Sequence, residues 1–167
     1  NRFLAIIERE ARRMQQLVID LLSISRVEAD RFRRPTTPVD FAAIVRHTLA
    51  QMKDSAEARP QDIADRLGDA AQPVLGDAAQ LGQLVHNIVS NAMKYGRAGT
   101  PVSIALASPK AGTVRITVAD QGEGVAPEHV PRLTERFYRV DPGRSRSLGG
   151  TGLGLAIVKH VVERHRG

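Results

Sequence analysis

The stretch NIVSNAMKYG (87–96) places two asparagines, a lysine and a tyrosine on an otherwise apolar segment. The hydrophobic period of the surrounding residues predicts a helix over 77–95. Its buried stripe consists of Leu81, Leu84, Val85, Ile88 and Ala92. The polar side chains form a second stripe beside it, made of Asn87, Asn91, Lys94 and Tyr95. Asparagine is unfavourable inside a helix, so the pattern indicates a ligand held at this border, with local capping as the alternative.

Two glycine-containing motifs follow. DQGEGV (120–125) ends a predicted strand with a carboxylate and continues with two glycines, which let a flat ring approach the backbone. Taken by itself, this motif is better explained by an ordinary Asp-Gly turn. RSRSLGGTGLGLAIV (144–158) leads into a predicted helix over about 151–165, whose N-terminal N–H groups suit phosphate. The P-loop sequence is absent, and the dinucleotide fingerprint fails because Ile157 stands in place of its third glycine.

The rest of the chain beyond residue 38 alternates between strand-like and helix-like patterns. The further predicted elements are a short strand at VDF (39–41), a helix over about 41–58, weak strands at 62–67 and 72–76, alternating strands at 101–108 and 113–120, and a short helix at 127–135. This order predicts an α/β (α+β) two-layer sandwich, with a mixed sheet packed on helices, preceded by one long amphipathic helix.

The long helix covers residues 1–29. Its apolar residues are spaced alternately by three and four, and Leu17 and Leu22 widen the resulting stripe. The stripe itself consists of Leu4, Ile7, Ala11, Met14, Val18 and Leu21. Such a face needs a partner helix, and we expect this chain to offer no second helix beside it. DRFRRPTTPV (30–39), with two prolines and a basic run, predicts the joint between two parts.

The composition of the chain argues against several kinds of site and several classes of protein. The chain has no cysteine, so disulfides and thiolate metal sites are ruled out. No apolar run approaches the roughly 18 residues of a membrane span, and the start at Asn1 suggests a cytosolic piece of a longer protein. The net charge of +6 is compatible with nucleic-acid binding, but only four Phe and two Tyr are present and no stacking motif interleaves with the basic residues. Solvated helix faces explain the charge better.

Four motifs occur in a fixed order: HNIVSNAMKYG (86–96), DQGEGV, RLTERFYRVD (132–141) and GGTGLGLAIV (149–158). Together they resemble the asparagine, first glycine, phenylalanine and second glycine boxes of sensor histidine kinases. That catalytic domain belongs to the gyrase/chaperone/histidine kinase/mismatch-repair ATPase superfamily, and the resemblance is closest to the phosphate-regulon type of sensor. FLAIIEREARRMQQLVIDLLSISRVE (3–28) resembles the second helix of their dimerisation and phosphotransfer hairpin.

The resemblance implies three parts: a hairpin helix over 1–30, a linker over 31–38 and an ATP-binding domain over 39–167. The implied cofactors are ATP and Mg²⁺, with Asn91 as the metal ligand. Lys94 would meet phosphate, and Tyr95 would pack on adenine. Asp120 would accept a hydrogen bond from the adenine amino group, and Gly122 and Gly124 would shape the pocket. The implied mobile lid and phosphate cradle contain Tyr138, Arg139, Gly150, Thr151, Gly152, Leu153, Gly154 and Leu155, with Arg144 and Arg146 as further candidates.

The implied catalytic residues are Asn87, Asn91 and Lys94, and Asn87 also counts among the nucleotide-binding residues. Hydrolysing members of the superfamily carry a glutamate at the position of Asn87 to activate water. The predicted helix contains no glutamate, and an amide cannot act as a base at neutral pH. The site is therefore expected to transfer a phosphoryl group and not to hydrolyse ATP.

The implied reaction moves the γ-phosphoryl group to a hairpin histidine, for relay to an aspartate of a response regulator. The implied setting is a homodimer formed through the hairpins, in the cytoplasmic domain of an inner-membrane protein anchored only through absent upstream segments. The family's His-Glu-x-Arg-Thr-Pro acceptor string does not occur in this sequence. From the resemblance, we also expect the family's final β-hairpin to be missing from it. A hydrolytic ATPase of the same superfamily and a non-catalytic, degenerate-kinase interaction module are the alternatives.

Overall fold

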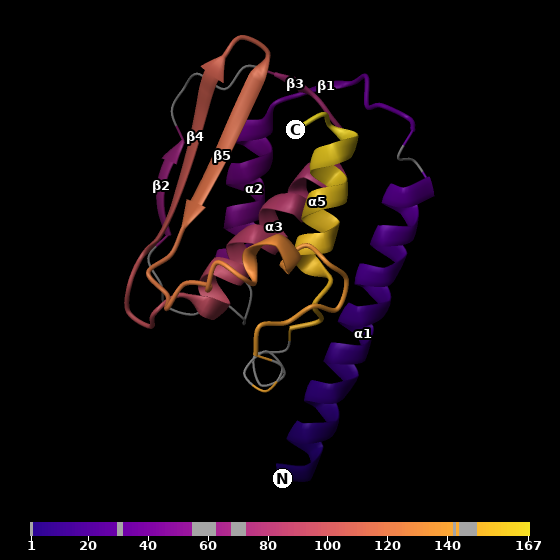
Figure 1. The fold of residues 1–167 in the computed structure, drawn as a ribbon, viewed down its shortest axis with the longest axis vertical. Helices are drawn as coiled ribbons and strands as arrows, with labels where there is room; N and C mark the ends of the chain where they lie inside the picture. The colour runs from indigo at the N-terminus through magenta and orange to yellow at the C-terminus, as the bar shows by residue number, and fades with distance from the viewer. Residues whose placement is uncertain (1, 30–31, 55–62, 68–72, 142, 144–149) are drawn as a thin grey trace. The chain divides into compact units, whose positions relative to one another are not determined.

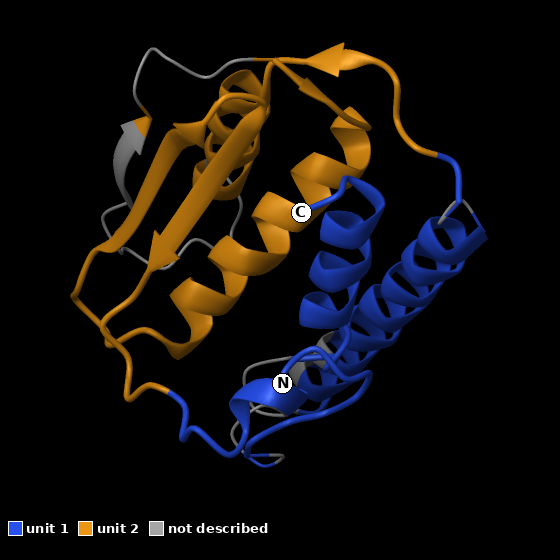
Figure 2. Ribbon diagram, turned by 45° about the horizontal axis from the view of Figure 1, so that its top comes forward, with its two compact units in different colours: residues 1–33, 125–167 blue, residues 34–124 orange. Residues whose placement is uncertain are grey.

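The structure is a computed structural model that describes residues 2–29, 32–54, 63–67, 73–141, 143 and 150–167. The chain divides into two compact units, which Figure 2 colours separately. Unit 1 consists of residues 1–33 and 125–167, and unit 2 consists of residues 34–124. The assignment of residues 1–30, 31–38 and 39–167 to three family parts stays a prediction.

Unit 2 contains the strands. A small antiparallel pair joins β1 (Pro38–Val39) to β3 (Val74–Leu75). In the three-stranded sheet, β4 (Val102–Lys110) lies between β2 (Ile63–Leu67), which runs parallel to it, and β5 (Thr113–Ala119), which runs antiparallel (Figure 1). The predicted mixed sheet is thus confirmed. Its strands lie close to where alternating hydrophobicity placed them.

The described residues of unit 2 also form two helices: α2 (Phe41–Asp54) and α3 (Ala78–Tyr95). They pack on each other, and α3 also contacts β4 and β5. The Asp77 side chain caps α3, with Oδ1 accepting hydrogen bonds of 3.1 Å from the N–H groups of Ala79 and Gln80. Among the described residues of this unit, the largest fully buried side chains are Val45, Val85, Val89, Val102 and Ile104.

The buried face of α3 differs from its prediction at one edge. Leu81, Leu84, Val85 and Ala92 are buried as expected, but Ile88 is only half-buried. Val89 and Met93 are buried in addition. The reason is that α3 packs against both a helix and a sheet, so its buried face is broader than one stripe and is turned towards Val89 and Met93.

Unit 1 contains α1 (Arg2–Ala29), the 3₁₀ turn η1 (Val130–Arg132) and α5 (Gly154–Arg164). The helix predicted at 127–135 is wrong, because only η1 forms there. Pro131 lies inside this segment, where it removes an N–H donor and disfavours a continued helix. The predicted helix at 151–165 begins later, at Gly154. Gly152 has φ +76°, a left-handed conformation that cannot belong to an α-helix.

Helix α1 packs along α5, so the expectation that the chain offers no helix beside α1 is wrong. The packing uses a different face from the predicted stripe: Asp20, Ile24 and Val27 are 2–4% exposed. The stripe itself stays open, because each of its large residues is at least half exposed: Leu4, Ile7, Met14, Val18 and Leu21. Among the helices of the described residues, none has the length and apolar character to cross a membrane.

Candidate functional site

The C-terminal half of α3 carries the first group of predicted site residues. Asn87, Asn91 and Lys94 are half-buried, and Tyr95 at the end of the helix is exposed. They border the buried face of α3, as the 100° spacing predicted. The N–H group of Gly96 closes the helix by donating to the carbonyl oxygen of Ala92 at 2.8 Å.

The motif DQGEGV meets this end of α3. A Cβ atom on Gly122 would lie 2.4 Å from the carbonyl oxygen of Tyr95, closer than real Cβ contacts allow. A Cβ atom on Gly96 would lie 3.4 Å from the Cβ atom of Asp120. The structure therefore brings Tyr95, Asp120 and Gly122 together within unit 2, and glycine at position 122 is what permits the close approach.

Asp120 is exposed, and its Oδ1 atom accepts a hydrogen bond from the N–H group of Gly122 at 2.7 Å. The side chain therefore forms a local turn, which is the alternative that the sequence left open. A carboxylate has two oxygens, so the turn and a ligand can both be served. Gly124 has φ +75°, and a Cβ atom there would meet nothing within 4 Å. Open space thus adjoins the turn.

The second group of predicted site residues lies in unit 1, where two segments are paired. The N–H group of Phe137 donates to the carbonyl oxygen of Gly152 at 2.8 Å. The guanidinium of Arg139 donates to the carbonyl oxygen of Gly150 at 2.5 Å. Phe137 itself has φ +63°, and a Cβ atom on Gly152 would lie 3.0 Å from its Cα atom. RLTERFYRVD and the Gly-rich segment are thus held together by a main-chain hydrogen bond and by the Arg139 side chain.

The side chain of Tyr138 is fixed by two neighbours. Its hydroxyl oxygen lies 2.6 Å from Nδ1 of His129, and the guanidinium carbon of Arg132 lies 4.1 Å from the centre of its ring. His129 therefore helps to hold Tyr138 in place. Of the predicted lid, residue 142 and residues 144–149, which include Arg144 and Arg146, lie outside the described residues.

The Gly-rich segment enters α5 through Thr151 and Leu153, which are 8% and 1% exposed. The N–H group of Leu153 donates to Oγ1 of Thr151 at 3.3 Å. The Thr151 hydroxyl in turn donates to Oδ2 of Asp20 at 2.6 Å. Gly150, Gly152, Gly154 and Leu155 are half-buried. Sequence reasoning missed Asp20, although an acidic residue inside the apolar run LVIDLL (17–22) was a usable signal.

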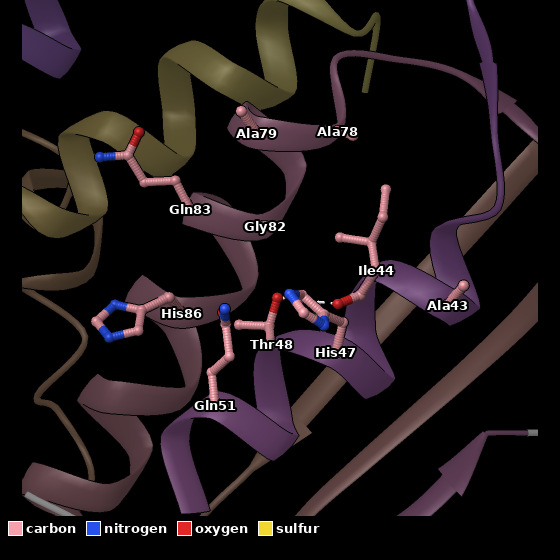
Figure 3. Close-up of a pocket in the computed structure, with 10 residues that line it drawn as sticks. All are labelled: Ala43, Ile44, His47, Thr48, Gln51, Ala78, Ala79, Gly82, Gln83 and His86. Atoms are coloured by element: carbon pink, nitrogen blue, oxygen red, sulfur yellow. Dashed lines mark hydrogen bonds between the residues drawn. The ribbon is translucent and has the colours of Figure 1, made fainter. Parts of the chain in front are cut away.

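A separate groove lies between α2 and α3 in unit 2 (Figure 3). His47 and His86 are exposed on its rim, and the Thr48 hydroxyl inside it donates to the carbonyl oxygen of Ile44 at 2.9 Å. None of the predicted site residues lines this groove. The lining residues are Ala43, Ile44, His47, Thr48, Gln51, Ala78, Ala79, Gly82, Gln83 and His86.

The chain belongs to the histidine kinase-, DNA gyrase B- and HSP90-like ATPase family, whose model matches residues 76–167. That range contains both paired sets of motifs described above. The expected family resemblance is therefore confirmed, together with the fold.

Within this family, the similar curated proteins are sensor histidine kinases. The phosphate regulon sensor protein PhoR of Pseudomonas aeruginosa is 40% identical over 168 residues, which cover 99% of this chain and 37% of that protein. The sensor-like histidine kinase SenX3 of Mycolicibacterium smegmatis is 37% identical over 167 residues, which cover 100% of this chain and 43% of that protein. This chain thus spans less than half the length of these two relatives.

Solved structures are also similar to this chain, among them the following two. The mycobacterial sensor histidine kinase MprB matches with a TM-score of 0.66 and 31% identity, over 78% of this chain and 80% of that one. The structure of full-length ShkA in complex with AMPPNP matches with a TM-score of 0.76 and 31% identity, over 98% of this chain and 34% of that one. The ATPase domain of a sensor histidine kinase is therefore the class of this chain.

Proposed function

We propose that this chain binds Mg·ATP and transfers the γ-phosphoryl group to a histidine on a dimerisation hairpin. A response-regulator aspartate would then receive the group. The observation that carries the proposal is the close approach of Gly122 to the main-chain carbonyl of Tyr95. A Cβ atom added to Gly122 would lie only 2.4 Å from that carbonyl oxygen. This approach places Asp120 beside the end of α3 that carries Asn87 and Asn91. The space next to Gly124 remains open.

In unit 2, the donor set fits a purine and a hard cation. The Asp120 carboxylate would accept a hydrogen bond from the exocyclic amine of adenine, and the Tyr95 ring would pack against the base. The amide oxygen of Asn91 is a hard ligand of the kind Mg²⁺ prefers, and Mg²⁺ keeps several other positions for water and phosphate. Asn87 and the Lys94 ammonium would contribute polar contacts to the phosphates.

In unit 1, the segment from Gly150 to Leu155 would hold phosphate oxygens. Its main-chain N–H groups precede the 11-residue helix α5, where the helix dipole favours negative charge. Tyr138 and Arg139 would help to form this cradle, since Arg139 already binds the Gly150 carbonyl. Bound Mg²⁺ would neutralise developing charge on the phosphates.

Transfer is favoured over hydrolysis because α3 carries no carboxylate that could activate water. Residues 78–95 contain neither Asp nor Glu, and phosphoryl transfer needs mainly alignment and charge neutralisation. A hydrolytic ATPase of the same family remains the second candidate. Steady-state phosphate release distinguishes the two, because a transferase without an acceptor should release phosphate very slowly.

A labelling experiment tests the proposal. The chain is incubated with γ-labelled ATP and Mg²⁺, alone and together with a separately produced dimerisation hairpin from a sensor kinase relative. We expect acid-labile, alkali-stable label on the hairpin, and no stable label on the chain alone. The five histidines His47, His86, His129, His160 and His165 lack the acceptor string around them. Phosphohistidine on any of these five, or rapid phosphate release without transfer, would contradict the proposal.

A further inference from the structure

Helix α1 buries a carboxylate that the proposed reaction does not use. Asp20 is 4% exposed, and its two oxygens accept hydrogen bonds from neutral donors: Oδ1 from the Gln16 amide at 2.8 Å and Oδ2 from the Thr151 hydroxyl at 2.6 Å. No Lys, Arg or His among the described residues forms an ion pair with it. A buried carboxylate without a cation is unfavourable unless its hydrogen bonds are kept, so the Thr151 contact is important for this arrangement.

The contact occupies groups at the start of α5. The Thr151 hydroxyl hydrogen is given to Asp20, and the Leu153 N–H group is given to Thr151 Oγ1 at 3.3 Å. We refer to Gln16, Asp20, Thr151 and Leu153 as the Asp20 network. The phosphates are proposed to bind at the segment 150–155. Two of its hydrogen-bond donors are already used: the Thr151 hydroxyl by Asp20 of α1, and the Leu153 N–H group by Thr151.

The C-terminal end of α1 and the segment that follows it make two further contacts. The Arg136 guanidinium, next to Phe137, forms an ion pair with Glu28 near the end of α1. In addition, the Arg164 guanidinium at the end of α5 donates to the carbonyl oxygen of Arg33 at 3.1 Å. Both contacts lie at or just after the C-terminal end of α1. The Asp20 network can therefore open while this C-terminal end stays attached to the rest of unit 1.

We propose that the Asp20 network makes nucleotide binding and the docking of α1 mutually exclusive at Thr151. This inference rests on the proposed nucleotide site. A phosphate at residues 150–155 competes with Asp20 for the Thr151 hydroxyl and brings negative charge towards a buried negative charge. Occupancy of the site therefore releases α1 from Thr151. By linkage, docking of α1 lowers nucleotide affinity by the same factor.

Asp20→Asn tests this coupling. Asparagine has nearly the same shape and still offers an oxygen to Thr151, but it carries no charge. In calorimetry with a non-hydrolysable ATP analogue and Mg²⁺, we expect this variant to bind about fivefold or more tightly than the parent, the lower end of usual coupling factors. Glu8→Gln is the matched control, since Glu8 is an exposed partner of Arg12 on the same helix. It should bind like the parent.

Hydrogen exchange on the unmodified chain gives a second readout that needs no variant. Saturating analogue should raise the exchange of the α1 amides around residues 16–24, because the helix loses its contact with Thr151. Equal or weaker binding by Asp20→Asn, or unchanged or slower α1 exchange, would overturn the coupling. Absence of binding by both the parent and Asp20→Asn would instead refute the proposed nucleotide site, and the coupling with it. Binding by Asp20→Asn alone would support the coupling in its strongest form.

Discussion

Gly122 lies directly against the main-chain carbonyl of Tyr95: a Cβ atom on the glycine would stand 2.4 Å from the carbonyl oxygen and 3.1 Å from the carbonyl carbon. The carbonyl group of Tyr95 cannot move away easily, because Tyr95 is the last residue of α3. The N–H group of the next residue, Gly96, is hydrogen-bonded to the carbonyl oxygen of Ala92. The relationship joins the two polar motifs of unit 2. It also fixes where the turn of Asp120 stands with respect to the helix.

Gly122→Ala should therefore weaken both folding and nucleotide binding. The added methyl group meets main-chain atoms, so the backbone must shift, and we expect a loss of about 1–3 kcal/mol in the free energy of unfolding. Urea denaturation measures the loss, and calorimetry with Mg·ATP measures the binding.

Gly82→Ala, inside α3, is the matched control, because the added Cβ atom would make an ordinary contact of 3.6 Å with Oγ1 of Thr48 in α2. We expect it to be stabilising by about 0.5–1 kcal/mol, since alanine is the better helix former. If Gly122→Ala were as stable as Gly82→Ala, the close approach to Tyr95 would not exist in solution.

Asn91→Ala should weaken the Mg²⁺-dependent part of ATP binding. Loss of an oxygen that contacts a charged group is expected to reduce affinity roughly 10- to 100-fold in Mg²⁺. In EDTA, the affinity should match that of the parent, because the adenine contacts are intact. Calorimetry under both conditions measures this. Gln83→Ala removes an amide from the same helix, on the groove shared with α2, and should have no effect on binding. Equal affinities of Asn91→Ala and parent in Mg²⁺ would remove Asn91 from the metal site.

Asp120→Ala should reduce the preference for ATP over GTP. A site built to accept a hydrogen bond from the adenine amine rejects a base that lacks that donor, and this rejection disappears with the acceptor. Competition binding of the two nucleotides measures the ratio. Asp120→Asn separates recognition from the local turn, since asparagine can still accept from the Gly122 N–H group. An unchanged ATP/GTP ratio in Asp120→Ala would show that Asp120 serves only the turn.

Asp77→Ala should lower stability without involving the site. Its Oδ1 atom accepts from the N–H groups of Ala79 and Gln80 at the start of α3, and loss of such a cap costs about 1 kcal/mol. Asp77→Asn should retain most of that stability, because asparagine caps a helix about as well. Thermal unfolding followed by circular dichroism compares the three proteins. A variant Asp77→Ala as stable as the parent would show that the cap contributes nothing.

The sequence by itself determined the elements that depend on neighbours along the chain. The period of apolar residues located α1, α2, α3 and the two strands β4 and β5 to within a few residues, because helices and strands repeat every 3.6 and 2 residues. The stripe of Asn87, Asn91 and Lys94 followed from the same spacing. The order of the four motifs was enough to indicate the family, since each motif is a continuous segment.

Only the tertiary structure decided the features that join distant segments. Asp20 and Thr151 are 131 residues apart, and no local period relates the inside of α1 to the start of α5. The packing of α1 on α5 also left the predicted stripe open, because a second face of the helix, around Ile24 and Val27, was the one that found a partner. Local spacing fixes which residues share a face. Which face is buried depends on the element that packs against it, and that is a property of the whole fold.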